Sequence, residues 1–91
     1  MLVGRRFVVA GRVQGVGFRF FAQSAAAREG ITGNVRNLDD GRVEIVAEGD
    51  AEAIARFERS VRQGPVASRV DDVLVDSRPA SGRFPDFRIL P

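Results

Sequence analysis

A glycine-rich segment near the amino terminus is the feature that most restricts what this chain can fold into. Residues 11–19 read GRVQGVGFR, after a run at 6–10 that is typical of a strand and before a run at 20–29 with helical periodicity. The first N–H groups of a helix lack an intrahelical acceptor, and the helix dipole favours negative charge beside them. The segment therefore predicts a turn between a strand and a helix that can hold an anion.

The residue types in this segment suit a phosphate group. Gly11, Gly15 and Gly17 let the backbone curl and approach a ligand closely. Arg19 supplies a planar cation that can contact two phosphate oxygens at once. Common nucleotide loops do not fit, because the chain has no lysine for a Walker loop and Phe20 replaces the third glycine of the dinucleotide motif. We predict a phosphate cradle, and a tight turn without a ligand is the alternative that these residues alone leave open.

The hydrophobic patterns along the whole chain predict five strands and two helices. The strands are expected at 6–11, 32–38, 42–48, 69–75 and 87–90, and the helices at 20–29 and 51–63. Residues 39–41 read DDG, a hairpin signal, while Asp50 and Gly64 suit the two ends of the second helix. This order predicts an α+β, ferredoxin-like sandwich, with two helices on one face of an antiparallel sheet and a short extra C-terminal strand.

Alternation within the predicted elements indicates which way they face. Apolar residues on both faces of the strand at 6–11 place it inside the sheet. In the strand at 42–48, Glu44 and Glu48 alternate with apolar residues, as in a sheet with one covered face. On the second helix, side chains of opposite charge at i,i+4 spacing should pair outside the core: Glu52 with Arg56 and Glu58 with Arg62.

Composition limits the chemistry that the chain can perform. It has 91 residues, 44% of them hydrophobic, so we expect one small domain spanning residues 1–91 that buries a core without metal or disulfides. Cysteine and histidine are both absent, which excludes a thiol nucleophile, a histidine base and a Cys/His zinc site. No carboxylates cluster as metal ligands would, and we predict neither a metal nor a cofactor.

Charge and hydropathy indicate where the protein acts. The formal net charge is +2, and arginine and acidic residues are interspersed rather than clustered as in a nucleic-acid-binding protein. The amino terminus lacks the apolar stretch of a signal peptide, and no run reaches membrane-spanning length. We expect a cytoplasmic monomer whose partner is a small molecule, with no nucleic acid and no membrane involved.

Two motifs resemble the signatures of the acylphosphatase family. Residues 11–19 match the first signature at every fixed position. Residues 33–49 match the second, except that Asn34 stands where the family has an aromatic residue. Residues 64–70 resemble the family's connection into its fourth strand, so the resemblance covers residues 5–90. It implies the same ferredoxin-like fold, and hydrolysis of acyl phosphates to a carboxylate and inorganic phosphate.

The resemblance also implies a division of roles. Arg19 holds the phosphoryl group, Asn37 holds the attacking water, and the loop completes the phosphate cradle mainly through its backbone amides: Gln14, Gly15, Val16, Gly17, Phe18 and Arg19. Phosphoryl transfer requires mainly positioning and charge stabilisation. Asn37 cannot act as a base, so we infer that the proton of the water passes to a phosphoryl oxygen. Phe20 and Phe21 are candidates to flank the acyl group, with at least one of them in the core.

The departure at Asn34 should affect packing rather than catalysis. Strand alternation places Asn34 on the opposite face of its strand from Asn37. We therefore expect a lower stability or a compensating neighbour, and not an inactive enzyme.

Two other functions remain open from the sequence. One is a non-catalytic ferredoxin-like module that binds RNA or a protein, although the strands at 32–38 and 42–48 have no aromatic ring on which bases could stack. The other is the acylphosphatase-like domain that opens larger carbamoyl-transfer maturation proteins. Because the chain ends at Pro91, we expect a free-standing enzyme. The predicted cradle recognises only the phosphate group of a substrate. Small acyl phosphates such as acetyl, carbamoyl and benzoyl phosphate should therefore all be accepted.

Overall fold

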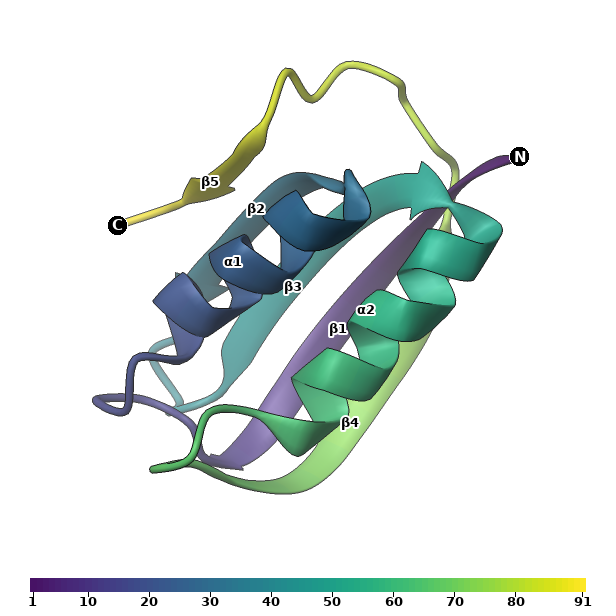
Figure 1. Ribbon diagram of the computed structural model, residues 1–91. Helices are drawn as coiled ribbons and strands as arrows, with labels where there is room; N and C mark the ends of the chain where they lie inside the picture. The colour runs from purple at the N-terminus through teal and green to yellow at the C-terminus, as the bar shows by residue number, and fades with distance from the viewer.

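Two helices lie side by side across one face of a five-stranded sheet in a computed structural model that describes residues 1–91 (Figure 1). The elements are β1 (Leu2–Arg12), α1 (Phe18–Glu29), β2 (Thr32–Asn37), β3 (Val43–Asp50), α2 (Ala51–Gln63), β4 (Arg69–Arg78) and β5 (Phe87–Ile89). The strands lie in the order β4-β1-β3-β2-β5. This arrangement confirms the predicted ferredoxin-like fold and the interior position of β1.

The extra strand makes the sheet mixed. The four long strands are antiparallel to their neighbours, whereas β5 runs parallel to β2, with Phe87 opposite Gly33. At the other edge of the sheet lies β4, in which all residues except Val70 and Val73 are exposed.

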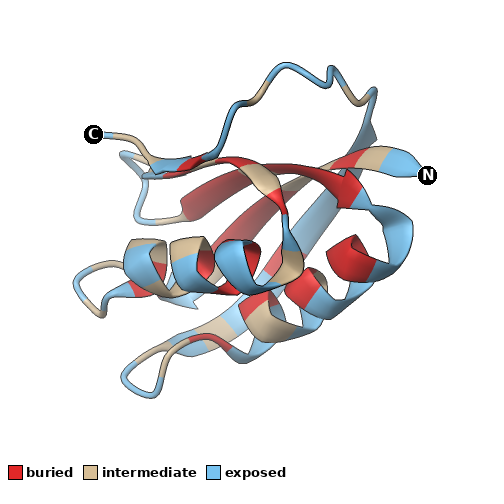
Figure 2. Cartoon of the chain, turned by 45° about the horizontal axis from the view of Figure 1, so that its top comes forward, coloured by how far each residue is buried: buried red, intermediate tan, exposed pale blue.

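The core lies between the helices and the sheet (Figure 2). Phe7 of β1, Phe57 of α2 and Phe87 of β5 meet edge to face, with ring centroids 5.9 and 6.0 Å apart. Burying an apolar side chain of this size stabilises the fold by roughly 1.5–3 kcal/mol. Val8 points to the other face and is also buried, as expected for an interior strand.

Element boundaries differ from the predicted ones where distant strands pair. Strand β1 begins at Leu2 rather than at residue 6, because Leu2 pairs with Asp50 of β3. Strand β4 continues to Arg78, which pairs with Gly4. Hydrogen bonding across the sheet thus extends strands through residues whose local pattern does not mark them as strand.

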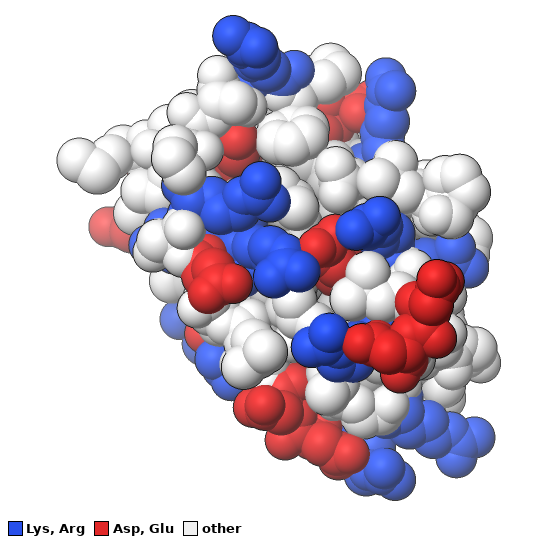
Figure 3. Space-filling model, turned by 180° about the vertical axis from the view of Figure 1, so that it is seen from behind, with Lys and Arg blue, Asp and Glu red and all other residues white.

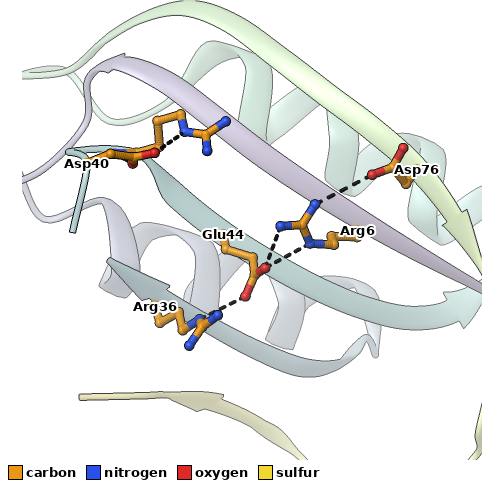
Figure 4. A network of polar contacts seen from close by, with 6 residues as sticks. Arg6, Arg36, Asp40, Glu44 and Asp76 are labelled. Atoms are coloured by element: carbon orange, nitrogen blue, oxygen red, sulfur yellow. Dashed lines mark hydrogen bonds and ion pairs between the residues drawn. The ribbon is translucent and has the colours of Figure 1, made fainter. Parts of the chain in front are cut away.

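The face of the sheet away from the helices carries a mixed layer of charges (Figure 3). Glu44 was expected to face solvent, yet it is only 9% exposed. It accepts hydrogen bonds of 2.8 Å from Nε of Arg6 and from Nε of Arg36, and Arg6 also pairs with Asp76 at 3.5 Å (Figure 4). Burial raises the pKa of Glu44, but the hydrogen bonds from the two guanidinium groups outweigh it and hold the pKa below its usual value.

A second glutamate on this face is buried by a different partner. Glu48, 5% exposed, accepts hydrogen bonds from Ser81 and Gly82 in the segment between β4 and β5. Both glutamates thus lie on the helix-free face of the sheet and are nevertheless buried. Two arginines cover the carboxylate of Glu44, and the segment between β4 and β5 covers that of Glu48.

One of the two predicted ion pairs on α2 is wrong. Arg62 binds Glu58 at 2.9 Å, as expected, but Arg56 binds Glu29 of α1 at 2.7 Å instead of Glu52. The carboxylate of Glu29 is partly buried on the neighbouring helix, so its attraction for a cation is less screened by water. Neither helix is long and apolar enough to cross a membrane.

Candidate active site

A small hollow at one end of the molecule brings the two motifs together. Its volume is about 110 Å³, and it is lined by Val13, Gly15, Gly17, Phe18, Arg19, Phe20 and Asn37. Arg19 comes from the first turn of α1 and Asn37 from the last residue of β2. A water molecule fills about 30 Å³ of liquid, so the hollow has room for a phosphoryl-sized group with a water beside it.

A larger hollow exists but lacks the chemistry for an anion. It measures about 570 Å³ and lies between the C-terminal half of α1, the start of β2 and Phe87. No arginine lines it, and its one charged residue is Asp86. An anion there would have no cation to balance it, so the smaller hollow is the better candidate site.

Two glycines give the loop its shape. Gly15 and Gly17 have φ of 73° and 79°, the left-handed region that other residues rarely adopt. Apart from the adjoining backbone, no atom lies within 4 Å of the position that a Cβ would take at either glycine, so conformation rather than space requires glycine there. Gly17 is the N-cap of α1 and offers no side-chain cap to the first turn.

The first turn of α1 presents unpartnered amides to the hollow. The first helical hydrogen bond runs from the N–H of Phe21 to the carbonyl of Gly17 at 3.0 Å, so the amides of residues 18–20 have no intrahelical acceptor. No acidic side chain occupies that turn. The positive end of the helix dipole therefore meets the hollow without a built-in anion.

Arg19 adds a cation at the same place. It is half-buried and, unlike Arg6, Arg36 and Arg42, it makes no ion pair with a carboxylate. A cation near the positive end of a helix is unfavourable unless an anion lies between them. The first turn and Arg19 together thus favour an anion held by both.

Asn37 enters the hollow from the end of β2. It pairs with Val43 of β3, directly before the turn at 38–41. In that turn the backbone N–H of Arg42 donates to Asp40, which lowers the pKa of the Asp40 carboxyl. The carboxylate of Asp40 thus stabilises the turn. The side-chain amide of Asn37, in contrast, makes no hydrogen bond within the protein.

Gln14 has a side-chain role that the sequence did not reveal. Its Nε2 donates to the carbonyl of Leu38 at 2.8 Å and to that of Arg42 at 3.0 Å. The side chain therefore binds the β2–β3 turn instead of lining the hollow. No local signal in the sequence could have shown this, because the acceptors are backbone groups far along the chain.

The two neighbouring phenylalanines have different environments. Phe21 packs against Phe18 of the core, with ring centroids 6.0 Å apart. Phe20 is 66% exposed and lines the hollow. Of these two rings, only that of Phe20 is therefore placed to meet a substrate at the hollow.

Asn34 lies on the helix-free face of the sheet, opposite Val46 and away from Asn37. It lines a separate hollow of about 220 Å³ together with Phe84, Pro85 and Arg88 of the C-terminal segment. Phe84 and Pro85 thus lie beside Asn34, the position at which the acylphosphatase signature has an aromatic residue.

Comparison with known proteins gives one consistent family. The acylphosphatase family profile matches residues 5–89. The acylphosphatase of Bacillus pumilus is 43% identical over 82 residues, which cover 90% of this chain and 91% of that protein. The crystal structure of acylphosphatase from Bacillus subtilis superposes with a TM-score of 0.94 at 43% identity, covering all of both chains.

A longer protein contains the same fold. The crystal structure of full-length HypF in the phosphate- and nucleotide-bound form matches with a TM-score of 0.89 at 28% identity, over all of this chain and 12% of that one. The profile match, the sequence identity and the superposition all span nearly the whole chain, and the protein belongs to the acylphosphatase family.

Proposed function

We propose that this protein hydrolyses acyl phosphates by in-line attack of a water held by Asn37 on a phosphoryl group held by Arg19 and the amides of residues 14–19. Its family makes it an enzyme that acts on acyl phosphates. The roles of the individual residues are supported by one observation above all. Arg19, the open amides of α1 and Asn37 surround the same hollow.

The cradle stabilises the charge that moves during phosphoryl transfer. Arg19 donates two parallel hydrogen bonds to two phosphoryl oxygens, and the loop amides donate to the remaining ones. These donors are fixed in place before the substrate arrives, so they stabilise the transition state without reorganising. They also supply the positive charge that a divalent ion supplies elsewhere, and no group of three or more acidic side chains gathers to hold one.

Asn37 orients the nucleophile opposite the leaving group. The water oxygen forms a bond to phosphorus as the bond from phosphorus to the acyl oxygen breaks, and the carboxylate leaves. A carboxylate needs no general acid, because it is stable at neutral pH. The proton of the water passes to a phosphoryl oxygen, since Asn37 cannot accept it. A pH–rate profile with a steep basic limb that belongs to an enzyme group would contradict this proton path.

The acyl group extends from the cradle towards solvent beside Phe20. An exposed ring offers apolar contact but no shaped pocket, and therefore limited selection among acyl groups. We expect acetyl, carbamoyl and benzoyl phosphate all to be hydrolysed.

The decisive experiment is hydrolysis of benzoyl phosphate by the purified protein in the presence of EDTA. Arg19→Ala and Asn37→Ala should both lose most of their turnover, each by about 100- to 1000-fold. Arg59→Ala and Asn34→Ala are matched controls, because Arg59 is exposed on α2 and Asn34 lies on the far face of the sheet. Both controls should keep turnover. A folded wild-type protein without turnover would instead favour a binding module, and titration with RNA would follow.

A further inference from the structure

The two halves of the site come from separate parts of the chain. The cradle belongs to the loop at residues 13–17 and the first turn of α1, whereas Asn37 belongs to β2. In-line attack depends on the position of one half relative to the other. A misplacement of about 1 Å can lower a rate about 100-fold. Something must therefore fix the loop against the strand.

Gln14 is the side chain that joins these two parts. Its Nε2 reaches the carbonyl of Leu38, the residue after Asn37, at 2.8 Å, and the carbonyl of Arg42 at 3.0 Å. No other side-chain hydrogen bond connects the loop at 13–17 to the β2–β3 turn. Both N–H groups of the Gln14 amide are used, so the loop is held to the turn at two points.

The two carbonyls that accept from Gln14 belong to the residues that close the hairpin between β2 and β3. The N–H of Leu38 donates to the carbonyl of Arg42 at 2.8 Å, so that oxygen accepts from both Leu38 and Gln14. Gln14 therefore binds the rigid end of the hairpin next to Asn37 rather than a mobile tip. It is also half-buried, which limits competition from water.

We propose that Gln14 is a positioning residue that sets the distance and direction of Asn37 from the phosphate cradle. This inference rests on the proposed function. Gln14 does not touch the phosphoryl group through its side chain. Removing its amide should impair the attack of the water while the cradle, which is shaped by Gly15, Gly17 and the start of α1, still binds phosphate.

The test is a double-mutant cycle between Gln14→Met and Asn37→Ala, assayed with benzoyl phosphate. Methionine has nearly the length of glutamine and lacks the donors. Inorganic phosphate, used as a competitive inhibitor, reports on the cradle alone. We expect Gln14→Met to lower kcat by about 10- to 100-fold, with little change in the inhibition constant of phosphate. In the Asn37→Ala background the same substitution should have almost no further effect, because coupled residues are not additive.

Gln23→Met is the matched control. Gln23 also donates from Nε2 to a backbone carbonyl, that of Phe87 at 3.2 Å, but away from the hollow. It should lower the melting temperature without changing kcat. If Gln14→Met does not fold, Gln14→Asn replaces it, since its side chain is one methylene shorter and cannot reach both carbonyls.

The outcomes separate the inference from the proposed function. Additive losses in kcat would overturn the role of Gln14, and so would a weaker phosphate inhibition at unchanged kcat. A wild-type protein that is folded but inactive on acyl phosphates would overturn the proposed function itself.

Discussion

Glu48 of β3 accepts a hydrogen bond of 2.8 Å from the backbone N–H of Ser81, which lies in the segment between β4 and β5. The Ser81 hydroxyl and the N–H of Gly82 donate to the same carboxylate at 3.0 and 2.9 Å. The buried side chain of Glu48 thus holds the segment between β4 and β5 against the sheet. No other side-chain hydrogen bond joins this segment to β3.

Replacing this anchor should lower stability in a pH-dependent way. Burial raises the pKa of Glu48, but the three hydrogen bonds outweigh it and hold the pKa below the reference value of 4.5. The unfolded chain therefore binds more protons than the folded one as pH falls below that value, and the contribution of Glu48 is lost as pH drops through its folded pKa. At pH 7 we expect Glu48→Gln to cost about 1–3 kcal/mol of unfolding free energy.

Urea denaturation at pH 7 and pH 3 measures this effect. The difference between wild type and Glu48→Gln should shrink at the lower pH. Asp72→Asn, at an exposed position of β4 without an ion pair, is the control and should change stability by less than about 0.5 kcal/mol. A difference of equal size at both pH values would show that the charge of Glu48 is not involved.

Arg19→Lys should be nearly as damaging as Arg19→Ala. An ammonium group is a point charge and cannot copy the planar fork of a guanidinium. Losing one such charge-stabilising donor typically lowers kcat by about 100- to 1000-fold. Stability should not fall, because the substitution to alanine removes a cation from the positive end of α1. Steady-state kinetics with benzoyl phosphate measure the loss of kcat, and thermal denaturation measures the stability. Near-normal turnover of Arg19→Lys would contradict the proposal that Arg19 contacts two phosphoryl oxygens at once.

Phe20→Ala should change substrate preference rather than folding. The ring is 66% exposed, so its loss should cost less than about 0.5 kcal/mol of stability. It should raise KM for benzoyl phosphate more than KM for acetyl phosphate, since only the larger acyl group contacts the ring. Leu74→Ala is the control, because Leu74 is 52% exposed on β4 and does not line the hollow. Equal changes in both KM values would place the acyl group elsewhere.

Two glycines should tolerate alanine to different degrees. A Cβ at Gly17 would meet no atom beyond the adjoining backbone within 4 Å, so Gly17→Ala should cost only the strain of the left-handed conformation, about 1–2 kcal/mol. Gly33 also has a positive φ, of 142°, but a Cβ there would collide with the carbonyl of Val46 on the neighbouring strand. Gly33→Ala should therefore destabilise the protein much more. Urea denaturation of both variants tests the ranking, and equal losses would show that the sheet yields at Gly33.

Features governed by local sequence could be predicted well. The glycine-rich loop, the DDG turn and the helical stripes depend on neighbouring residues, and they gave the element order and the segments that form the hollow. Asn37 could be linked to Arg19 only through the family resemblance, because their meeting depends on the packing of β2 beside α1. The acceptors of Gln14, the partner of Arg56 and the burial of Glu48 were beyond prediction, since each depends on groups brought together by the completed fold.

The open edge at β4 also bears on how the protein behaves in concentrated solution. The inner side of β4 is paired with β1, but the backbone donors and acceptors on its outer side form a template on which a second molecule can add its own strand. A symmetric antiparallel pairing of two copies would bring their β4 aspartates close together, so we expect the like charges of Asp72 and Asp76 to oppose self-association. Replacing both with asparagine should therefore promote association through this edge at neutral pH, which light scattering would reveal. The acidic residues of β4 thus act as a barrier against aggregation.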